Sequence, residues 1–254
     1  MNTTTLCLPP RAHKPRATGL TMVIDGGISL WHFTDIISSA ADYIDFVKFG
    51  WGTAVVTADL RAKISVLHAH ETGYYFGGTL FEKYLLQDRF DDFRKFCLGH
   101  GCRHVEVSNG TIGISNSEKA SYIRKLTDDF TVISEVGFKD PVRSDQLPPD
   151  MWIEYIREDL AAGSSLVTLE ARESGRSGIC QADGTLRSGL VEDMLTSGID
   201  QGSLLFEAPT TSLQAHFITQ LGPDVNLGNI PAQGVLGLET LRLGLRADTL
   251  TAFE

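Results

Sequence analysis

The strongest constraint in this sequence is a regular alternation of short apolar runs with longer segments of helical character. The apolar runs are rich in branched and aromatic residues, as in strands that are buried on both faces. Strand–helix alternation indicates a parallel sheet, and about eight units in 254 residues favour a closed barrel over an open sheet. We therefore predict an α/β fold, a single (β/α)8 TIM barrel at residues 19–254 that follows an N-terminal arm at residues 1–18. The predicted strands are Thr21–Asp25, Tyr43–Gly50, Tyr74–Thr79, His104–Gly110, Thr131–Gly137, the start of the stretch Ser165–Gly178, Ser203–Ala208 and Val225–Ile230.

Local signals mark the starts of several helices between these strands. Ser115 with Glu118, and Thr211 with Gln214, match the capping-box pattern, in which two side chains satisfy the first free N–H groups of a helix. A last helix is expected from Val235 to about Leu250.

Composition narrows the possible partners and the compartment. The formal net charge is −10, which disfavours binding to nucleic acid or to an anionic membrane surface. No apolar run approaches the roughly 20 residues that span a bilayer, and the N-terminus lacks the apolar core of a signal peptide. The four cysteines show neither a CxxC pair nor zinc-ligand spacing, which is typical of reduced thiols. We expect a cytoplasmic protein.

Polar residues recur where the predicted strands end, and the strand ends of a barrel meet at one mouth. Several carboxylates around one cavity repel each other unless cations lie among them. Lys48, Lys139 and Arg172 could supply positive charge, and Mg²⁺, which prefers oxygen ligands, could supply more. The candidates at the mouth are Asp25, Lys48, Glu106, Ser108, Asn109, Glu135, Lys139, Glu170, Arg172, Glu207, Asn226, Gly228 and Asn229.

The stretch Ser165–Gly178 joins a buried strand directly to a charged loop. If the alternation of the strand continues, Glu170 and Arg172 point to the same face and Glu173 points away. Ser174 and Arg176 follow in the loop as possible mobile contacts for an anion.

The strand-end sequences resemble, in order, the blocks of phosphosulfolactate synthases, from about Lys14 to Leu250. The matching blocks are TMVID, YIDFVKFGWGT, GGTLFE, EVSNGT, SEVGFKDP, EARESG with the following GIC, LLFEAP, VNLGNI and LETLRLGLRADTL. The resemblance implies a (β/α)8 barrel and a carbon–sulfur lyase that adds sulfite to phosphoenolpyruvate with Mg²⁺. The product is (2R)-2-phospho-3-sulfolactate, on a route to coenzyme M or to sulfolactate. One departure is that Gly26 and Gly27 follow Asp25, where many archaeal members read DKGL or similar.

This chemistry suggests roles for the mouth residues. Sulfite is itself the nucleophile, so the protein must stabilise charge on the substrate carboxylate and deliver a proton to the phosphate-bearing carbon. Lys139 is the predicted proton donor, with its pKa lowered towards neutrality by nearby cations and partial desolvation, and Glu170 and Arg172 complete the predicted catalytic set. Metal ligands are expected among Glu106, Glu135, Glu207 and Asp25. Substrate contacts are expected from Lys48, Ser108, Asn109, Ser174, Arg176, Asn226, Gly228 and Asn229, the last three in the region after the eighth strand where barrels often bind phosphate.

Two other functions stay open at this point. The Gly-Gly pair after Asp25 fits an enzyme of the same fold that adds another nucleophile to phosphoenolpyruvate. A non-catalytic, stress-related member of the family is the second alternative. Small anionic substrates and a homo-oligomer are the expected partners.

Overall fold

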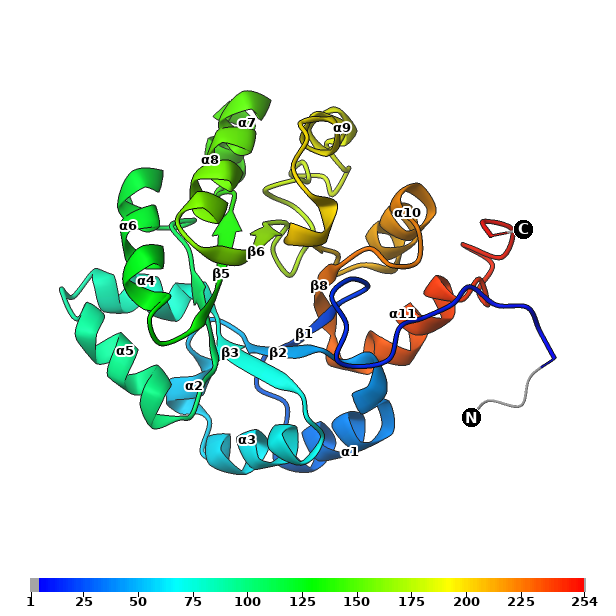
Figure 1. Cartoon of the computed structure of the whole chain (residues 1–254), viewed down its shortest axis with the longest axis horizontal. Coiled ribbons are helices and arrows are strands. Elements are labelled where there is room, and N and C mark those ends of the chain that lie inside the picture. Colours follow the sequence, from blue (N-terminus) through cyan, green and yellow to red (C-terminus); the bar gives the residue numbers. More distant parts are fainter. Residues whose placement is uncertain (1–4, 254) are drawn as a thin grey trace.

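The computed structural model describes residues 5–253 and shows a nearly closed barrel of eight parallel strands surrounded by helices (Figure 1). The predicted fold class is confirmed. The strands are hydrogen-bonded in the order β3-β2-β1-β8-β7-β6-β5-β4, so β3 and β4 end the series and lie side by side as a seam. Their bounds are β1 (Thr21–Asp25), β2 (Phe46–Phe49), β3 (Gly73–Phe76), β4 (His104–Val107), β5 (Thr131–Val136), β6 (Ser164–Leu169), β7 (Leu204–Glu207) and β8 (Leu227–Pro231).

The helices form the outer ring, and most of them connect consecutive strands (Figure 1). They are α1 (Leu30–Ala40), α2 (Thr53–Val56), α3 (Leu60–Ala69), α4 (Gly78–Leu85), α5 (Phe90–Gly99), α6 (Asn116–Leu126), α7 (Pro141–Gln146), α8 (Pro149–Ala161), α9 (Ser188–Thr196), α10 (Thr211–Leu221) and α11 (Val235–Arg242). Short 3₁₀ turns precede β2, β7 and α11, at η1 (Ala41–Tyr43), η2 (Gln201–Ser203) and η3 (Ala232–Gly234).

The helix-start predictions are confirmed at one place and wrong at another. Ser115 and Glu118 form the capping box of α6. Thr210, and not Thr211, caps α10, because its side chain accepts the N–H of Leu213. The side chain of Gln214 donates instead to the carbonyl of Ala208, which ties α10 to the end of β7.

Two predicted boundaries also run too far. The third strand ends at Phe76, and α4 begins at Gly78 inside the segment that we predicted as strand. The last helix ends at Arg242, because the N–H of Leu245 turns back to the carbonyl of Thr240 and Gly244 takes a left-handed φ of 66°.

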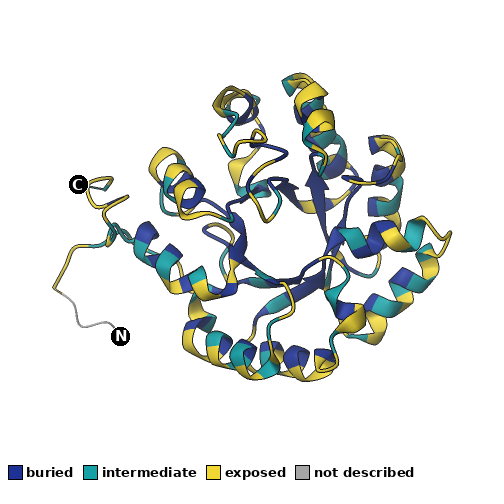
Figure 2. Ribbon diagram, turned by 180° about the vertical axis from the view of Figure 1, so that it is seen from behind, coloured by how far each residue is buried: buried dark blue, intermediate teal, exposed yellow. Residues whose placement is uncertain are grey.

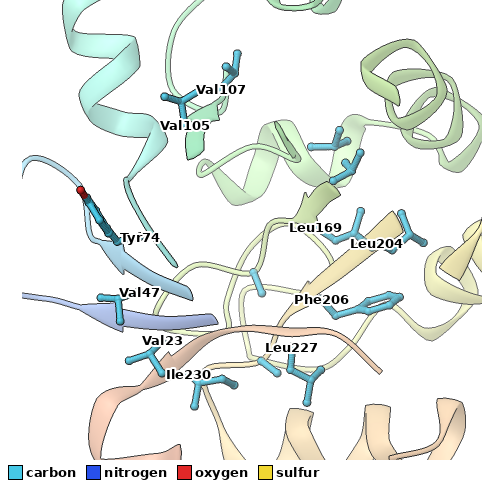
Figure 3. Close-up of a cluster of buried hydrophobic side chains, with 14 of the residues drawn as sticks. Val23, Val47, Tyr74, Val105, Val107, Leu169, Leu204, Phe206, Leu227 and Ile230 are labelled. Atoms are coloured by element: carbon cyan, nitrogen blue, oxygen red, sulfur yellow. The ribbon is translucent and has the colours of Figure 1, made fainter. Parts of the chain in front are cut away.

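The core follows from the two-residue period of the strands. One face of each strand points outward and packs on the helices, as Val23, Val47, Leu169 and Phe206 show (Figure 3). Burial of each such side chain contributes about 1.5–3 kcal/mol. Figure 2 shows the result, with buried strands at the centre and helices that are buried only on their inner side.

The inward-facing side chains are arranged in two layers. The lower layer is apolar and consists of Leu20, Met22, Tyr75, Ile133, Leu166 and Leu205, with Phe46 packed against it. Two residues farther along three of these strands the inward residue is charged: Lys48 follows Phe46, Glu135 follows Ile133, and Glu207 follows Leu205. A dry apolar layer therefore lies directly beneath the charged mouth.

The described part of the arm, residues 5–18, lies along α11 and under the N-terminal ends of the strands (Figure 1). Arg11 pairs with Glu239 of α11 at 3.0 Å and Arg16 with Asp45 at 2.9 Å. A cavity of about 810 Å³ opens at this end, and none of the predicted site residues lines it. No helix within residues 5–253 has the length and apolar character needed to cross a bilayer.

The loop after β6 depends on one close backbone contact. A Cβ on Gly178 would lie 1.7 Å from the carbonyl oxygen of Glu170, and Gly178 has a φ of +63°. Gly184, in the same loop, has a φ of +93°, but a Cβ there would meet no atom closer than 3.6 Å, which is an ordinary van der Waals contact.

We predict that Gly178→Ala disrupts this loop, whereas Gly184→Ala adds only backbone strain. The expected loss in free energy of unfolding is about 1–2 kcal/mol for Gly184→Ala and at least about 4 kcal/mol for Gly178→Ala. Urea denaturation of both variants measures the difference. Equal losses at the two positions would contradict the close contact.

Candidate active site at the barrel mouth

The centre of the mouth is an ammonium group held by carboxylates from three strands. Nζ of Lys48 lies 3.0 Å from Oε1 of Glu106, 3.3 Å from Oε2 of Glu135 and 3.5 Å from Oε1 of Glu207. All four side chains are buried, so the attraction between opposite charges is only weakly screened. Burial opposes the charge on Lys48, but the three carboxylates outweigh it and raise the pKa of Lys48 well above its ordinary value.

A second lysine approaches the same carboxylates from the loop after β5. Nζ of Lys139 lies 3.6 Å from Oε1 of Glu135 and donates to the hydroxyl of Thr79 at 2.8 Å. Burial opposes its charge, but Glu135 and Glu170 prevail and raise the pKa of Lys139. Our prediction of a lowered pKa is therefore wrong for this site, because carboxylates and not cations dominate the surroundings of Lys139.

The pKa values of Glu135 and Glu170 are shifted in opposite directions. Although burial opposes ionisation, Lys139 and Lys48 lower the pKa of Glu135 to about 2. Burial and the charges of Glu135 and Glu207 raise the pKa of Glu170 well above its ordinary value. The opposite directions of these shifts place a proton on Glu170 and leave Glu135 ionised.

Backbone N–H groups anchor the carboxylates from behind. Oε2 of Glu106 accepts from the N–H of Gly78, at the start of α4, at 2.5 Å. Oε2 of Glu207 accepts from Ala171 at 2.8 Å and from Arg172 at 3.0 Å, and Arg172 also donates to Oε1 of Glu170 at 2.6 Å. In Glu106 and Glu207 one oxygen is thus fixed to the backbone while the other faces Lys48.

Three residues with strained backbone line the pocket above this cluster, which we call the mouth pocket. Trp51, Arg172 and Asn229 all have left-handed φ angles, of 52°, 62° and 51°. Such angles are costly for residues other than glycine and tend to gather at functional sites. The charged residues of the mouth pocket include Lys48, Glu135, Lys139, Glu170, Arg172 and Glu207.

Comparisons with known proteins give the family of this chain. A family model described as (2R)-phospho-3-sulfolactate synthase (ComA) matches residues 9–248. The chain belongs to the phosphosulfolactate synthase family. It is 51% identical to the phosphosulfolactate synthase of Bacillus subtilis, over 98% of this chain and 99% of that protein. It is 41% identical to that of Methanothermobacter thermautotrophicus, over 98% of each.

Family membership confirms the resemblance of the strand-end blocks and identifies the chain as an enzyme of the synthase type. Among solved structures, a 3-hexulose-6-phosphate synthase superposes with a TM-score of 0.55 at 13% identity. The superposition covers 87% of this chain and 99% of that one, and it shows a common fold.

The predicted pair Glu170 and Arg172 does meet in the mouth pocket, but not by strand alternation. β6 ends at Leu169, and the left-handed φ of Arg172 turns the chain, so the two-residue period no longer applies. The guanidinium of Arg172 lies at the rim, where it donates to the carbonyl of Lys139 at 3.3 Å and faces Glu173 at 3.7 Å. It is partly exposed and can turn towards a ligand.

Several predicted site residues have structural partners away from Lys48. Asp25 pairs with Lys63 of α3 at 2.5 Å and accepts the N–H groups of Gly27 and Ile28, so it faces the helices. The amide of Asn109 donates to the carbonyl of Ile114, within the loop after β4. Neither residue lines the mouth pocket.

The three residues predicted after the eighth strand lie at different places along it. Asn226 precedes β8 and bonds to Leu20, Gly202 and Leu204 at the bottom of the barrel, which contradicts its predicted place at the mouth. Gly228 lies inside β8, where a Cβ would meet Met22 and Leu205. Asn229 alone reaches the mouth pocket.

Ser174 and Arg176 are exposed on the loop after β6, outside the residues that line the mouth pocket. The structure thus brings together Lys48, Glu106, Glu135, Lys139, Glu170, Arg172, Glu207 and Asn229.

Sequence reasoning missed two residues of α4. Glu82 is buried and accepts the hydroxyl of Ser108 at 2.5 Å and the N–H groups of Thr111 and Ile112 at 3.0 and 3.1 Å. Thr79, three residues earlier on the helix, receives the hydrogen bond of Lys139. The two glycines before Thr79 were the available signal, since they favour a turn and a helix start over a continuing strand.

The donor chemistry of the mouth suits a hard cation, although no cage is preformed. Oε1 of Glu135, Oε2 of Glu170 and Oδ1 of Asn229 are buried and receive no N–H donor. Within residues 5–253, no group of three or more His, Cys, Asp or Glu side chains is arranged to hold a metal ion. Mg²⁺ usually needs only one or two protein carboxylates beside water and substrate oxygens, so the oxygens present fit it.

The carboxyl group of Glu106 titrates near neutral pH in the folded protein. Burial raises its pKa from 4.5 to about 7. The native protein therefore keeps a proton that the unfolded chain loses above about pH 4.5. This contribution to the free energy of unfolding, at most roughly 3 kcal/mol, is fully present below the unfolded-state pKa and is lost as the pH rises through about 7.

We predict that Glu106→Gln removes this loss. The difference in free energy of unfolding between the variant and the unmodified protein should shift in favour of the variant between about pH 4.5 and pH 7. Urea denaturation across this range measures it, with Glu173→Gln at the exposed rim as the control. Parallel pH profiles for the Glu106 variant and the unmodified protein would argue against the raised pKa.

Proposed function

We propose that this enzyme catalyses the Mg²⁺-dependent addition of sulfite to phosphoenolpyruvate, which yields (2R)-2-phospho-3-sulfolactate. Membership of the phosphosulfolactate synthase family supports the reaction. The observation that carries it is the pair of ammonium groups on buried Lys48 and half-buried Lys139, which share Glu135 at one pocket. Such a site suits a substrate that carries a carboxylate and a phosphate.

The mouth pocket can bind both ends of this substrate. Lys48 and Lys139 offer ammonium groups, and Arg172 offers a guanidinium at the rim that suits bidentate contact with a phosphate, carboxylate or sulfite. Trp51 also lines the mouth pocket beside these cations.

The reaction needs no protein nucleophile. The lone pair on sulfur forms the C–S bond at the methylene carbon, and the π electrons of the double bond move towards the substrate carboxylate. A proton must then reach the carbon that bears the phosphate. The acid is Lys139, which its raised pKa keeps protonated.

A raised amine pKa does not prevent this transfer, because the carbon of the carboxylate-stabilised carbanion is far more basic than an amine. Glu170, which holds a proton in the free site and interacts with Lys139, is placed to restore the proton afterwards. Glu170 and Lys139 together form the proton supply, while Arg172 orients the anions.

Glu135, whose carboxylate also pairs with Lys48, would hold Mg²⁺ with Oδ1 of Asn229, oxygens of the substrate and water. When bound, the metal supplies stabilisation of the negative charge that develops on the substrate carboxylate. We further propose that the enzyme works in the cytoplasm, as a homo-oligomer, and that its product feeds coenzyme M or sulfolactate biosynthesis.

Phosphorus NMR tests the reaction directly. We expect a new phosphomonoester signal only when phosphoenolpyruvate, sulfite, Mg²⁺ and enzyme are all present, without release of phosphate. No sulfite-dependent product would refute the proposal. A product formed with a thiol or another nucleophile in place of sulfite would favour the same-fold alternative, and no turnover with any nucleophile would favour a non-catalytic role.

We predict that Lys139→Met lowers kcat by about a hundredfold to ten-thousandfold, the usual contribution of a general acid, with a smaller change in KM. Steady-state kinetics on folded protein measures both constants. Lys83→Met, an exposed change on α4, is the control and should leave kcat unchanged. A loss confined to KM would show that Lys139 binds substrate without donating the proton.

A further inference from the structure

The point where three carboxylate oxygens converge is already filled by the ammonium of Lys48. The three N–O separations lie between 3.0 and 3.5 Å. Mg²⁺ requires oxygens at about 2.0–2.1 Å in a nearly octahedral shell. These oxygens are therefore spaced for an ammonium group, and within residues 5–253 no group of three or more His, Cys, Asp or Glu side chains is arranged to hold a metal ion.

The carboxylates are less free to move than the lysine. Glu106 is held through its other oxygen by Gly78, and Glu207 is held by Ala171 and Arg172. Lys48 has a long unbranched side chain, and its ammonium group pairs with these two carboxylates and with Glu135. A rearrangement of the cluster must therefore begin with the ammonium group.

The resident charges disfavour either ligand alone. A divalent cation that enters first meets two ammonium groups beside the carboxylates, and an anionic substrate that enters first meets the carboxylates. When both enter together their charges largely cancel. The substrate phosphate or carboxylate also attracts Lys48 away and leaves carboxylate oxygens free for the cation.

We propose that Lys48 is the resident cation of the substrate-free site, and that a divalent metal ion binds tightly only together with the phosphorylated substrate. The inference rests on the proposed function for the identity of that substrate. It makes Lys48 a switch between an internal ion-pair cluster and a ternary complex of enzyme, metal and substrate.

The first experiment measures Mn²⁺ binding by electron paramagnetic resonance, with the full chain and without sulfite. We expect phosphoenolpyruvate to tighten Mn²⁺ binding by about tenfold or more, after correction for the Mn²⁺–phosphoenolpyruvate complex formed in protein-free solution. By linkage, Mn²⁺ should tighten phosphoenolpyruvate binding by the same factor. Equal Mn²⁺ affinity with and without phosphoenolpyruvate would overturn the proposal.

The second experiment removes the resident cation. Lys48→Met should bind Mn²⁺ without substrate about tenfold more tightly than the unmodified protein, and Mn²⁺ should raise its melting temperature. Lys63→Met is the matched control, since it removes a buried lysine that pairs with Asp25 outside the mouth pocket. It should gain no affinity for Mn²⁺. A folded Lys48→Met protein with unchanged Mn²⁺ affinity would contradict the proposal.

Circular dichroism checks that both variants fold, and if Lys48→Met does not, the coupling in the unmodified protein decides the matter alone. Failure of the proposed function looks different. Coupled binding of Mn²⁺ and phosphoenolpyruvate without a sulfite-dependent product would refute the reaction but support the role of Lys48.

Discussion

The buried ion pairs of Lys48 are the interaction on which the rest of the mouth depends. Four buried carboxylates beside an apolar layer would repel each other strongly, and burial alone would favour their neutral forms. Lys48 and Lys139 compensate part of this charge, and the proton on Glu170 compensates more. The same balance leaves the site able to exchange its internal cations for a bound anion and metal.

The seam between β3 and β4 is the second constraint, because these two strands are not joined by a ladder of hydrogen bonds. α4 bridges it at the top. Its first N–H binds Glu106 of β4, and Glu82 holds the loop that follows β4. Gly78 is required at this crossing, since a Cβ there would lie 2.4 Å from the hydroxyl of Ser108. The helix that closes the barrel therefore also positions Thr79 against Lys139.

The fold could be predicted from the sequence because strand and helix periods are local properties. The mouth could be predicted in part, because strand ends converge in any barrel of this kind. What the sequence did not show was the course of the loops. The turn at Arg172, the early start of α4 and the pairing of Glu82 with backbone N–H groups all depend on contacts between loops that are distant in the chain. The pKa of Lys139 depends on the same contacts, so its direction was predicted wrongly.

Asp25 shows that the face of the strand to which a side chain points matters more than its closeness to the strand end. In β1 the outward residue Val23 packs on the helices, so Asp25, two positions later, must also face outward, and Ile24 between them lines the mouth pocket. In β2 the outward residues are Val47 and Phe49, which leaves Lys48 inside. The same rule sends Glu135 inward between Ser134 and Val136. A charged residue at a barrel strand end should therefore be assigned to the mouth only when its apolar neighbours along the strand face the helices. Asp25 fails that test, and Lys63 is the buried cation that its outward position requires.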